Sequence, residues 1–432
     1  MKINVYELAK LSLRERSELL TRAEVDITGL LDTVRPIIAS VREHGDDALS
    51  DYAKKFDQAL VTPTTLAAKK NDFQRARDRL EPKLKDAIEI SARNIRNFHK
   101  KQMPEEMWLM EVAPGIIAGE KVTPISSVGL YVPRGKGSFP SVMLMLCIPA
   151  VIAKVPKVIV CTPPTPEGTI DDASLYAAEV CGVTDLYKVG GSQAIAAMAY
   201  GTQVIPKVDK VIGPGNPYVS AAKRLLYGTI DVGIPAGPSE AIILCDETTA
   251  PDIAAMDLLI EAEHGPDSSA LLVTHSAKLA DEVRARLPSL INELPSERKN
   301  FCMSVMSTYG GIVITRNLDE SVDFVNAFAP EHMEVLVEEP MAVLPKIKNA
   351  GEILLGKYTP ITFGNFSLGV NAILPTGGFA KTFSCVTVHD FLKRSSVGYV
   401  TQDGYRDLKD PAYQLATYEG FPSHARAVRA RA

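Results

Sequence analysis

The sequence predicts an α/β protein built on parallel sheets, and three observations support that class. The chain has 432 residues, more than one hydrophobic core usually serves, so at least two packed units are expected. From about residue 125, short β-rich runs such as "KVIVCTP" and "KVIGPG" alternate with segments of helical pattern. A second alternating series follows "IPAGPSE" and includes "AIILCD", "ALLVTH" and "MEVLVEE". Strands that alternate with helices are typical of parallel sheets, and the two series predict two Rossmann-like units.

The segments that flank these units are expected to be small and helical. Apolar residues between positions 84 and 98 recur at three- and four-residue steps, as on an amphipathic helix. The C-terminal tail is polar and too short for a core of its own, so it is expected to dock elsewhere, with another subunit as one candidate. The expected units are an N-terminal helical segment at 1–25, a first Rossmann-like domain at 26–130 plus 240–386, a second at 131–239, and a tail domain at 387–432.

Composition and charge exclude several classes of function. Hydrophobic residues make up 46% of the chain and charged residues 23%, as in ordinary globular proteins. Lys and Arg number 47 against 52 Asp and Glu, so the chain lacks the excess of basic residues that is typical of nucleic-acid-binding proteins. The N-terminus lacks the apolar core of a signal peptide, and the longest apolar stretch is broken by prolines and lysines. We therefore expect a cytoplasmic protein that binds neither nucleic acid nor membrane.

Two glycine-containing turns are candidate cofactor loops. "PRGKGSFPS", which follows Tyr131, has G-x-G but no third glycine, so it is a weak dinucleotide signal. "GPGNPYV" forms a tight turn that lets a ligand approach the backbone, with Asn216 placed to donate or accept a hydrogen bond. A plain strand-to-helix turn explains the first pattern better than a dinucleotide fingerprint does, and a plain turn explains the second pattern equally well.

Two pairs of polar residues are candidates for chemistry among the seven histidines. In "EAEHGPD", Glu261 and His264 are three residues apart at the end of a helical run, so both side chains can converge on one ion. The alternative is a charged helix end. In "APEHMEV", Glu331 and His332 stand at the entrance to a β-run, where carboxylate and imidazole suit general acid/base catalysis. A polar loop is the alternative there.

The ordered set of motifs resembles the histidinol dehydrogenase family from about residue 30 to His424. The set comprises "GLYVPRGKGSFPS", "KVGGSQAIAAMAYGT", "VIGPGNPYV", "PAGPSE", "EAEHGPDS", "FAPEHMEV", "GNFSLGVNAILPTGG" and "EGFPSHARAV". The resemblance implies a zinc-dependent, NAD-linked homodimer with shared active sites that oxidises a primary alcohol to a carboxylate in two hydride transfers. It also implies two Rossmann-like domains with small N- and C-terminal domains, the first carrying most metal and catalytic residues and the second binding NAD.

The resemblance assigns roles to the cofactor-binding and catalytic residues. By motif, Tyr131, Gln193 and Asn216 are similar to the family's NAD contacts. His332 is similar to the general base that takes the alcohol proton. Glu331 is similar to the residue that activates the water attacking the aldehyde.

The metal and substrate residues follow from the same motifs. Four positions are similar to the family's zinc ligands, and the last of them reaches in from the partner subunit: Glu261, His264, Asn365 and His424. The implied substrate contacts are Ser239, Glu261, His264, His332, Asn365, Glu419 and His424.

Departures from the family pattern bear on the metal and the substrate. Glu261 stands where the family usually has Gln, and Asn365 where it has Asp, so the total ligand charge is unchanged. Ala372 replaces a histidine of the family's "TNH", which weakens recognition of an imidazole. Arg134 and Lys136 add two positive charges to the loop after Tyr131. They could contact the substrate, the cofactor or only solvent.

We therefore expect a dehydrogenase for a small polar primary alcohol other than histidinol. L-Histidinol, as in histidine biosynthesis, is the first alternative. The second is a catalytically silent homologue that binds a metal or ligand, although retention of Glu331 and His332 argues against it.

Overall fold

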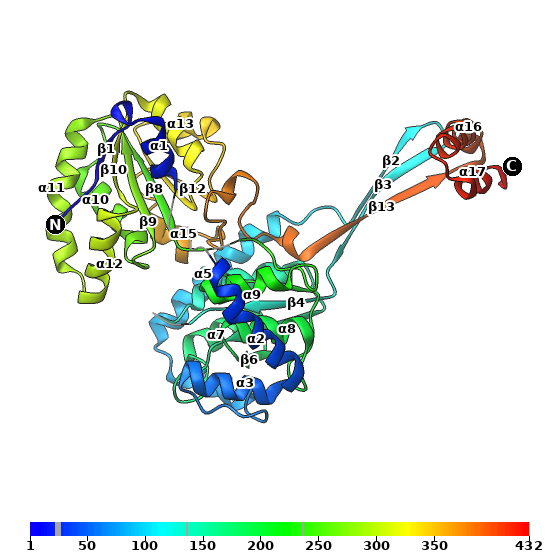
Figure 1. Ribbon diagram of the computed structural model, residues 1–432, viewed down its shortest axis with the longest axis horizontal. Coiled ribbons are helices and arrows are strands. Elements are labelled where there is room, and N and C mark those ends of the chain that lie inside the picture. Colours follow the sequence, from blue (N-terminus) through cyan, green and yellow to red (C-terminus); the bar gives the residue numbers. More distant parts are fainter. Residues whose placement is uncertain (22–26, 135–136, 236, 432) are drawn as a thin grey trace.

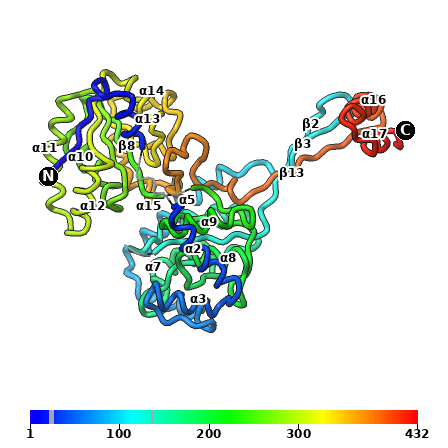
Figure 2. The backbone as a smooth tube through the Cα atoms, in the orientation of Figure 1, coloured from blue at the N-terminus to red at the C-terminus, as the bar shows by residue number. Residues whose placement is uncertain are grey.

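The computed structural model describes residues 1–21, 27–134, 137–235 and 237–431. Figures 1 and 2 show two α/β bodies side by side and a long arm that projects away from both. Each body is built on one parallel sheet, and the arm is a three-stranded antiparallel sheet. The expected α/β class with parallel sheets is confirmed.

The first body has a six-stranded sheet of order β1-β10-β9-β8-β11-β12, all parallel. Its strands are β1 (Val5–Glu7), β8 (Glu240–Cys245), β9 (Ser269–Thr274), β10 (Gly311–Ile314), β11 (His332–Leu336) and β12 (Glu352–Leu355). One face is covered by α10 (Pro251–Ala262), α11 (Ala277–Glu293) and α12 (Ser296–Ser307). The other is covered by α1 (Leu13–Leu20), α13 (Leu318–Phe328) and α14 (Pro340–Val343). Because helices cover both faces of the sheet, β8 is buried throughout, which explains its apolar sequence after Glu240.

The N-terminal segment contributes a strand as well as a helix. Val5 of β1 pairs with Ile312 of β10, so β1 extends the six-stranded sheet at its edge. The prediction of a purely helical segment at 1–25 is wrong for residues 5–7. Three residues are too few to display a period of two, and the strand partner lies some three hundred residues later in the chain. Residues 22–25 lie outside the described residues.

The second body has a four-stranded sheet of order β6-β5-β4-β7. Its strands are β4 (Ser127–Tyr131), β5 (Lys157–Thr162), β6 (Leu186–Lys188) and β7 (Lys210–Ile212). Within its own segment, α6 (Pro140–Ile152) and α7 (Asp172–Cys181) pack on one face, and α8 (Gly191–Tyr200) and α9 (Pro217–Leu226) pack on the other. Helices therefore cover both faces, as a parallel sheet requires.

The helices between residues 28 and 101 also pack on the four-stranded sheet. α4 (Lys70–Arg79) and α5 (Pro82–Lys101) join the face of α6 and α7, while α2 (Thr28–His44) and α3 (Asp46–Tyr52) join the face of α8 and α9. The expected grouping of 26–130 with 240–386 therefore does not describe these helices, which pack with 131–239. Periodicity shows that a helix has an apolar face but not which sheet will cover it.

The arm joins segments from opposite ends of the chain. Its sheet has the order β13-β3-β2, and its tip carries two helices. The elements are β2 (Met107–Ala113), β3 (Ile116–Pro124), β13 (Leu392–Val400), α16 (Gln402–Tyr418) and α17 (Pro422–Arg429). The tail at 387–432 was expected to be helical, but it begins with a 3-10 turn and the nine-residue strand β13. Every residue of β2 is exposed, including Met107, Trp108 and Leu109.

Short elements complete the chain. They are η1 (Leu8–Lys10), η2 (Ala53–Asp57), η3 (Leu344–Lys346), α15 (Ile361–Phe366), η4 (Phe379–Lys381) and η5 (Val388–Phe391). Among the described residues, no helix combines the length and the apolar character needed to cross a bilayer.

Candidate active site

The candidate catalytic residues gather at the amino edge of the six-stranded sheet. His332 is the first residue of β11 and follows Glu331 directly, while Glu240 and Glu352 are the first residues of β8 and β12. Helix α10 follows β8 and returns across the sheet, so its last turn brings Glu261 to the same edge. Segments about one hundred residues apart thus meet at one point.

His332 lies in a buried cage of carboxylates. Its Nδ1 is 2.6 Å from Oε1 of Glu352, and its Nε2 is 3.8 Å from Oε1 of both Glu261 and Glu331. His332 is 3% exposed and Glu261 1%. Oε2 of Glu331 accepts a hydrogen bond from the backbone N–H of Glu240 at 2.9 Å. The acid and base that were predicted as a pair are therefore neighbours in a dry environment.

The cage carries an excess of negative charge. Burial alone would lower the pKa of His332, but Glu261, Glu331 and Glu352 together raise it to about 10. Burial raises the pKa of Glu331 well above its usual range. A divalent cation beside Glu261 would offset these carboxylates and favour the neutral imidazole that a general base needs. The charge balance of the site thus suits a bound metal ion.

Three of the four predicted metal ligands lie together. Oε2 of Glu261 is 3.1 Å from Nδ1 of His264, and Oε1 of Glu261 accepts a hydrogen bond from Nδ2 of Asn365 at 3.0 Å. Rotation of the Asn365 amide would present its oxygen instead. One imidazole, one carboxylate and one amide oxygen are ligand types that zinc accepts. Within the described part of the chain, no group of three or more His, Cys, Asp or Glu side chains is arranged to hold a metal, so this set needs a further ligand.

The fourth predicted ligand, His424, is not brought to this site within one chain. It lies on α17 at the tip of the arm, against the ring of Phe421 at a centroid distance of 5.1 Å. Glu419, which ends α16, is at the same tip, and both side chains are exposed. Figure 1 shows this tip far from β12 and α15. A single chain therefore brings together three of the four predicted ligands, and His424 lies apart from them.

The predicted NAD contacts lie at the carboxyl ends of the four-stranded sheet. Tyr131 ends β4, and its hydroxyl accepts a hydrogen bond from the N–H of Gly191 at 3.0 Å. Gln193 is in the first turn of α8, and Asn216 caps α9 through a bond from the N–H of Val219 at 3.1 Å. Strand order reverses between β4 and β7, and such switch points are where open α/β sheets bind ligands.

A cleft of about 850 Å³ links the two bodies. Asn216 lines it from the four-stranded body, and Glu240 and Ser269 line it from the amino edge of the six-stranded sheet. Ser239, a predicted substrate contact, lies between two residues that line the cleft, and its carbonyl accepts a hydrogen bond from the N–H of Ser269 at 2.9 Å. A ligand in this cleft would reach from the cofactor turn toward the cage around His332.

Sequence reasoning missed three functional candidates that the fold places here. Lys223 lines the cleft, donates to the carbonyl of Gly213, and has its pKa lowered to about 8 by burial. Glu240 lines the cleft, and Glu352 touches His332. A lysine in a helix and acids at strand ends are ordinary in sequence, so only the three-dimensional arrangement identifies them.

The residues expected to set specificity lie apart from the cage. Ala372 packs against the core of the four-stranded body, and its N–H points at the sulfur of Met145 at 3.3 Å. Arg134 donates to the carbonyl of Pro164 at 3.4 Å. Lys136 lies outside the described residues.

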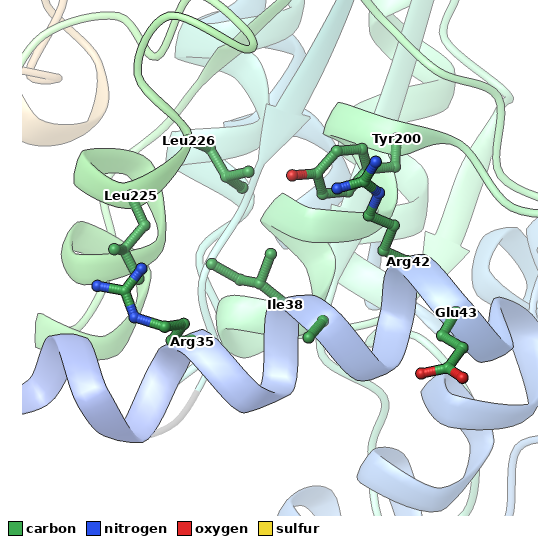
Figure 3. A pocket seen from close by; sticks show the side chains of 8 residues that line it. Arg35, Ile38, Arg42, Glu43, Tyr200, Leu225 and Leu226 are labelled. Carbon is green, nitrogen blue, oxygen red and sulfur yellow. The ribbon is translucent and has the colours of Figure 1, made fainter.

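A second hollow, of about 470 Å³, lies where α2 packs against α8 and α9 (Figure 3). Its walls come from α2, α8 and α9, with Arg35, Ile38 and Leu225 among its residues. The guanidinium of Arg42 stacks 5.2 Å from the ring centre of Tyr200. None of the predicted site residues lines this hollow, so it is separate from the chemistry described above.

Comparison with known proteins identifies the family. The sequence model for histidinol dehydrogenase matches residues 20–432. The chain is 50% identical over 427 residues to a histidinol dehydrogenase of Synechocystis sp., covering 99% of this chain and 98% of that one. It is also 50% identical to a histidinol dehydrogenase homolog of Rhizobium meliloti, with 99% and 94% covered. The crystal structure of histidinol dehydrogenase from Elizabethkingia anophelis matches with a TM-score of 0.94 at 32% identity, covering 99% of this chain and 98% of that one. The chain therefore belongs to the histidinol dehydrogenase family, a family of NAD-linked, zinc-dependent oxidoreductases that act on a CH–OH group.

Proposed function

We propose that this protein oxidises L-histidinol with NAD, through the aldehyde to the carboxylate, at a zinc site beside His332. The observation that carries the proposal is the buried cage in which His332 contacts both Glu352 and the metal-ligand set of Glu261. The relatives favour the histidinol alternative over the expectation of a different alcohol.

The first half-reaction removes a proton and a hydride from the alcohol. Nε2 of His332 takes the proton of the alcohol oxygen, and the hydride of the carbinol carbon passes to NAD, which leaves an aldehyde and NADH. Burial of His332 excludes bulk water from this step. When bound by Glu261, His264 and Asn365, zinc would polarise the substrate oxygen.

The second half-reaction needs a water and a second NAD. Glu331 orients the water that adds to the aldehyde carbon, and His332 again accepts a proton as hydride leaves the hydrate. One alcohol, one water and two NAD give one carboxylate, two NADH and three protons. The cleft lined by Asn216 and Glu240 is where the nicotinamide would approach the substrate carbon.

We also propose a homodimer in which each arm completes the partner's metal site. In one chain, β2 is exposed over all of its seven residues, including five large apolar side chains: Met107, Trp108, Leu109, Met110 and Val112. So much exposed apolar surface marks a protein contact. A second copy that covers the arm would also receive His424 and Glu419 at its own site.

Steady-state NADH formation tests the substrate. Purified protein should turn over L-histidinol in preference to a panel of amino, carboxylated and sulfonated alcohols, with two NADH formed per alcohol at completion. The departures at Ala372 and at the ligand pair Glu261 and Asn365 favour the second candidate, another small polar alcohol. Preferred turnover of a panel member would establish that candidate, and no turnover of any alcohol by zinc-loaded dimer would refute both.

A further inference from the structure

Glu352 contacts His332 on the side opposite Glu261 and Glu331, and the mechanism proposed above gives it no chemical role. Oε1 of Glu352 lies 2.6 Å from Nδ1 of His332, and the two side chains are 6% and 4% exposed. A carboxylate can only accept here, so the proton must be on Nδ1. In the neutral imidazole that a general base needs, the lone pair then lies on Nε2, the nitrogen that faces Glu261 and Glu331.

The fold holds Glu352 in this position. His332 and Glu352 are paired directly across β11 and β12, so their side chains project from the same face of the sheet. Gly364 of α15 lies against the carboxylate, because a Cβ there would be 2.8 Å from both oxygens. The glycine that precedes Asn365 thus leaves the room that Glu352 occupies.

A second buried acid lies behind this pair without adding charge. Glu334 follows His332 by two residues on the same face of β11 and is fully buried. Burial and the nearby carboxyl of Asp257 raise the pKa of Glu334 to about 10. Glu334 is therefore neutral near pH 7, whereas Glu352 is the carboxyl group that contacts the imidazole directly.

We propose that Glu352 is a positioning residue for the alcohol oxidation. It holds His332 in the Nδ1–H tautomer, and it stabilises the imidazolium that forms when Nε2 takes the alcohol proton. The proton moves from the substrate oxygen to Nε2, the Nδ1 proton stays on the ring, and Glu352 receives none. This inference rests on the proposed function, since it assigns His332 as the base.

Steady-state kinetics of Glu352→Ala and Glu352→Gln provide the first test. The alanine variant should lose about 100-fold or more in kcat, with KM within about threefold of wild type, because a positioned general base contributes roughly 10² to 10⁴. The glutamine variant should recover part of this loss, because its amide oxygen still accepts from Nδ1–H but carries no charge. Glu334→Gln is the matched control, a buried acid on the same strand face that should retain most activity.

The tautomer of His332 provides a second readout that needs no turnover. In ¹⁵N-histidine-labelled protein, the ring nitrogen shifts of His332 are identified by their loss in His332→Gln. Wild type should show a protonated Nδ1, and Glu352→Ala should shift His332 toward the Nε2–H form. An inactive wild type would refute the proposed function while these shifts still decide the role of Glu352.

Two results would overturn the inference. One is kcat of Glu352→Ala within about threefold of wild type; the other is the same His332 tautomer in wild type and Glu352→Ala. If the alanine variant does not fold, the test rests on Glu352→Gln, because glutamine has nearly the same shape as glutamate. Its kcat should fall about tenfold at unchanged KM, and wild-type kcat would contradict the role of the charge.

Discussion

Replacing Glu334 with glutamine should stabilise the protein at neutral pH, and the gain should grow with pH. The pKa of Glu334 is raised to about 10 in the folded protein by burial and by Asp257, against 4.5 for the ordinary group. The folded state therefore keeps a proton that the unfolded state releases. Because the folded pKa is the higher one, stability contributed by this group is fully present below about pH 4.5 and is lost as pH rises toward 10.

The magnitude follows from that difference in protonation. Each pH unit between the two pKa values costs wild type about 1.4 kcal/mol, while a glutamine binds no proton in either state. The free energy of unfolding of Glu334→Gln minus that of wild type should therefore rise by about 4 kcal/mol between pH 5 and pH 8. Glutamine has nearly the same shape and can donate to Asp257 as a protonated acid does, so packing is conserved.

Denaturant unfolding at pH 5, 6, 7 and 8, at one protein concentration, measures this difference. Glu339→Gln, at an exposed position, is the control and should give a difference that does not change with pH. A flat profile for Glu334→Gln as well would refute the reasoning, since it would mean that Glu334 is ionised in the folded protein.

Three further outcomes are expected at the site. His264→Ala should reduce zinc content well below the one equivalent per chain expected of wild type, measured by elemental analysis after dialysis, with the fold intact by circular dichroism. Lys223→Met should weaken NAD binding about tenfold, as measured by fluorescence titration. The substitution removes the hydrogen bond from Lys223 to the carbonyl of Gly213, in the turn that carries Asn216. Mixing inactive His332→Ala and His424→Ala chains should restore part of the activity once subunits exchange, and no recovery after verified exchange would mean that each site is built from one chain.

Sequence patterns predicted the strands of both sheets well because those strands are covered on both faces. Strand β8, for example, is buried at every residue, and after its first residue, Glu240, its sequence is an uninterrupted apolar run. The short edge strand β1 and the arm strands β2 and β13 were missed because their residues are largely exposed and carry no such signal. Their partners also lie far away in sequence, and pairing of that kind is decided by the assembled fold.

The candidate site was predicted in the same partial way. Glu261 and His264 are one helical turn apart, so local geometry brings them together, and Glu331 and His332 are adjacent. Glu352 is twenty residues beyond His332 and meets it through strand register alone. No local spacing encodes that register, and only the resemblance to a family connected Asn365 with the α10 pair.

The charged residues of the site come from three separate elements and meet in the interior, so their charges must compensate one another. Glu261 comes from α10, His332 from β11 and Glu352 from β12, and each is buried where an unpaired charge would be costly. An imidazole shared by three carboxylates is protonated, which is unsuited to a general base. A cation beside Glu261 would offset part of this negative charge and favour the neutral imidazole. Since the proposed fourth ligand, His424, lies on the distant arm, cation binding and assembly of two chains should depend on each other, and both should precede catalysis.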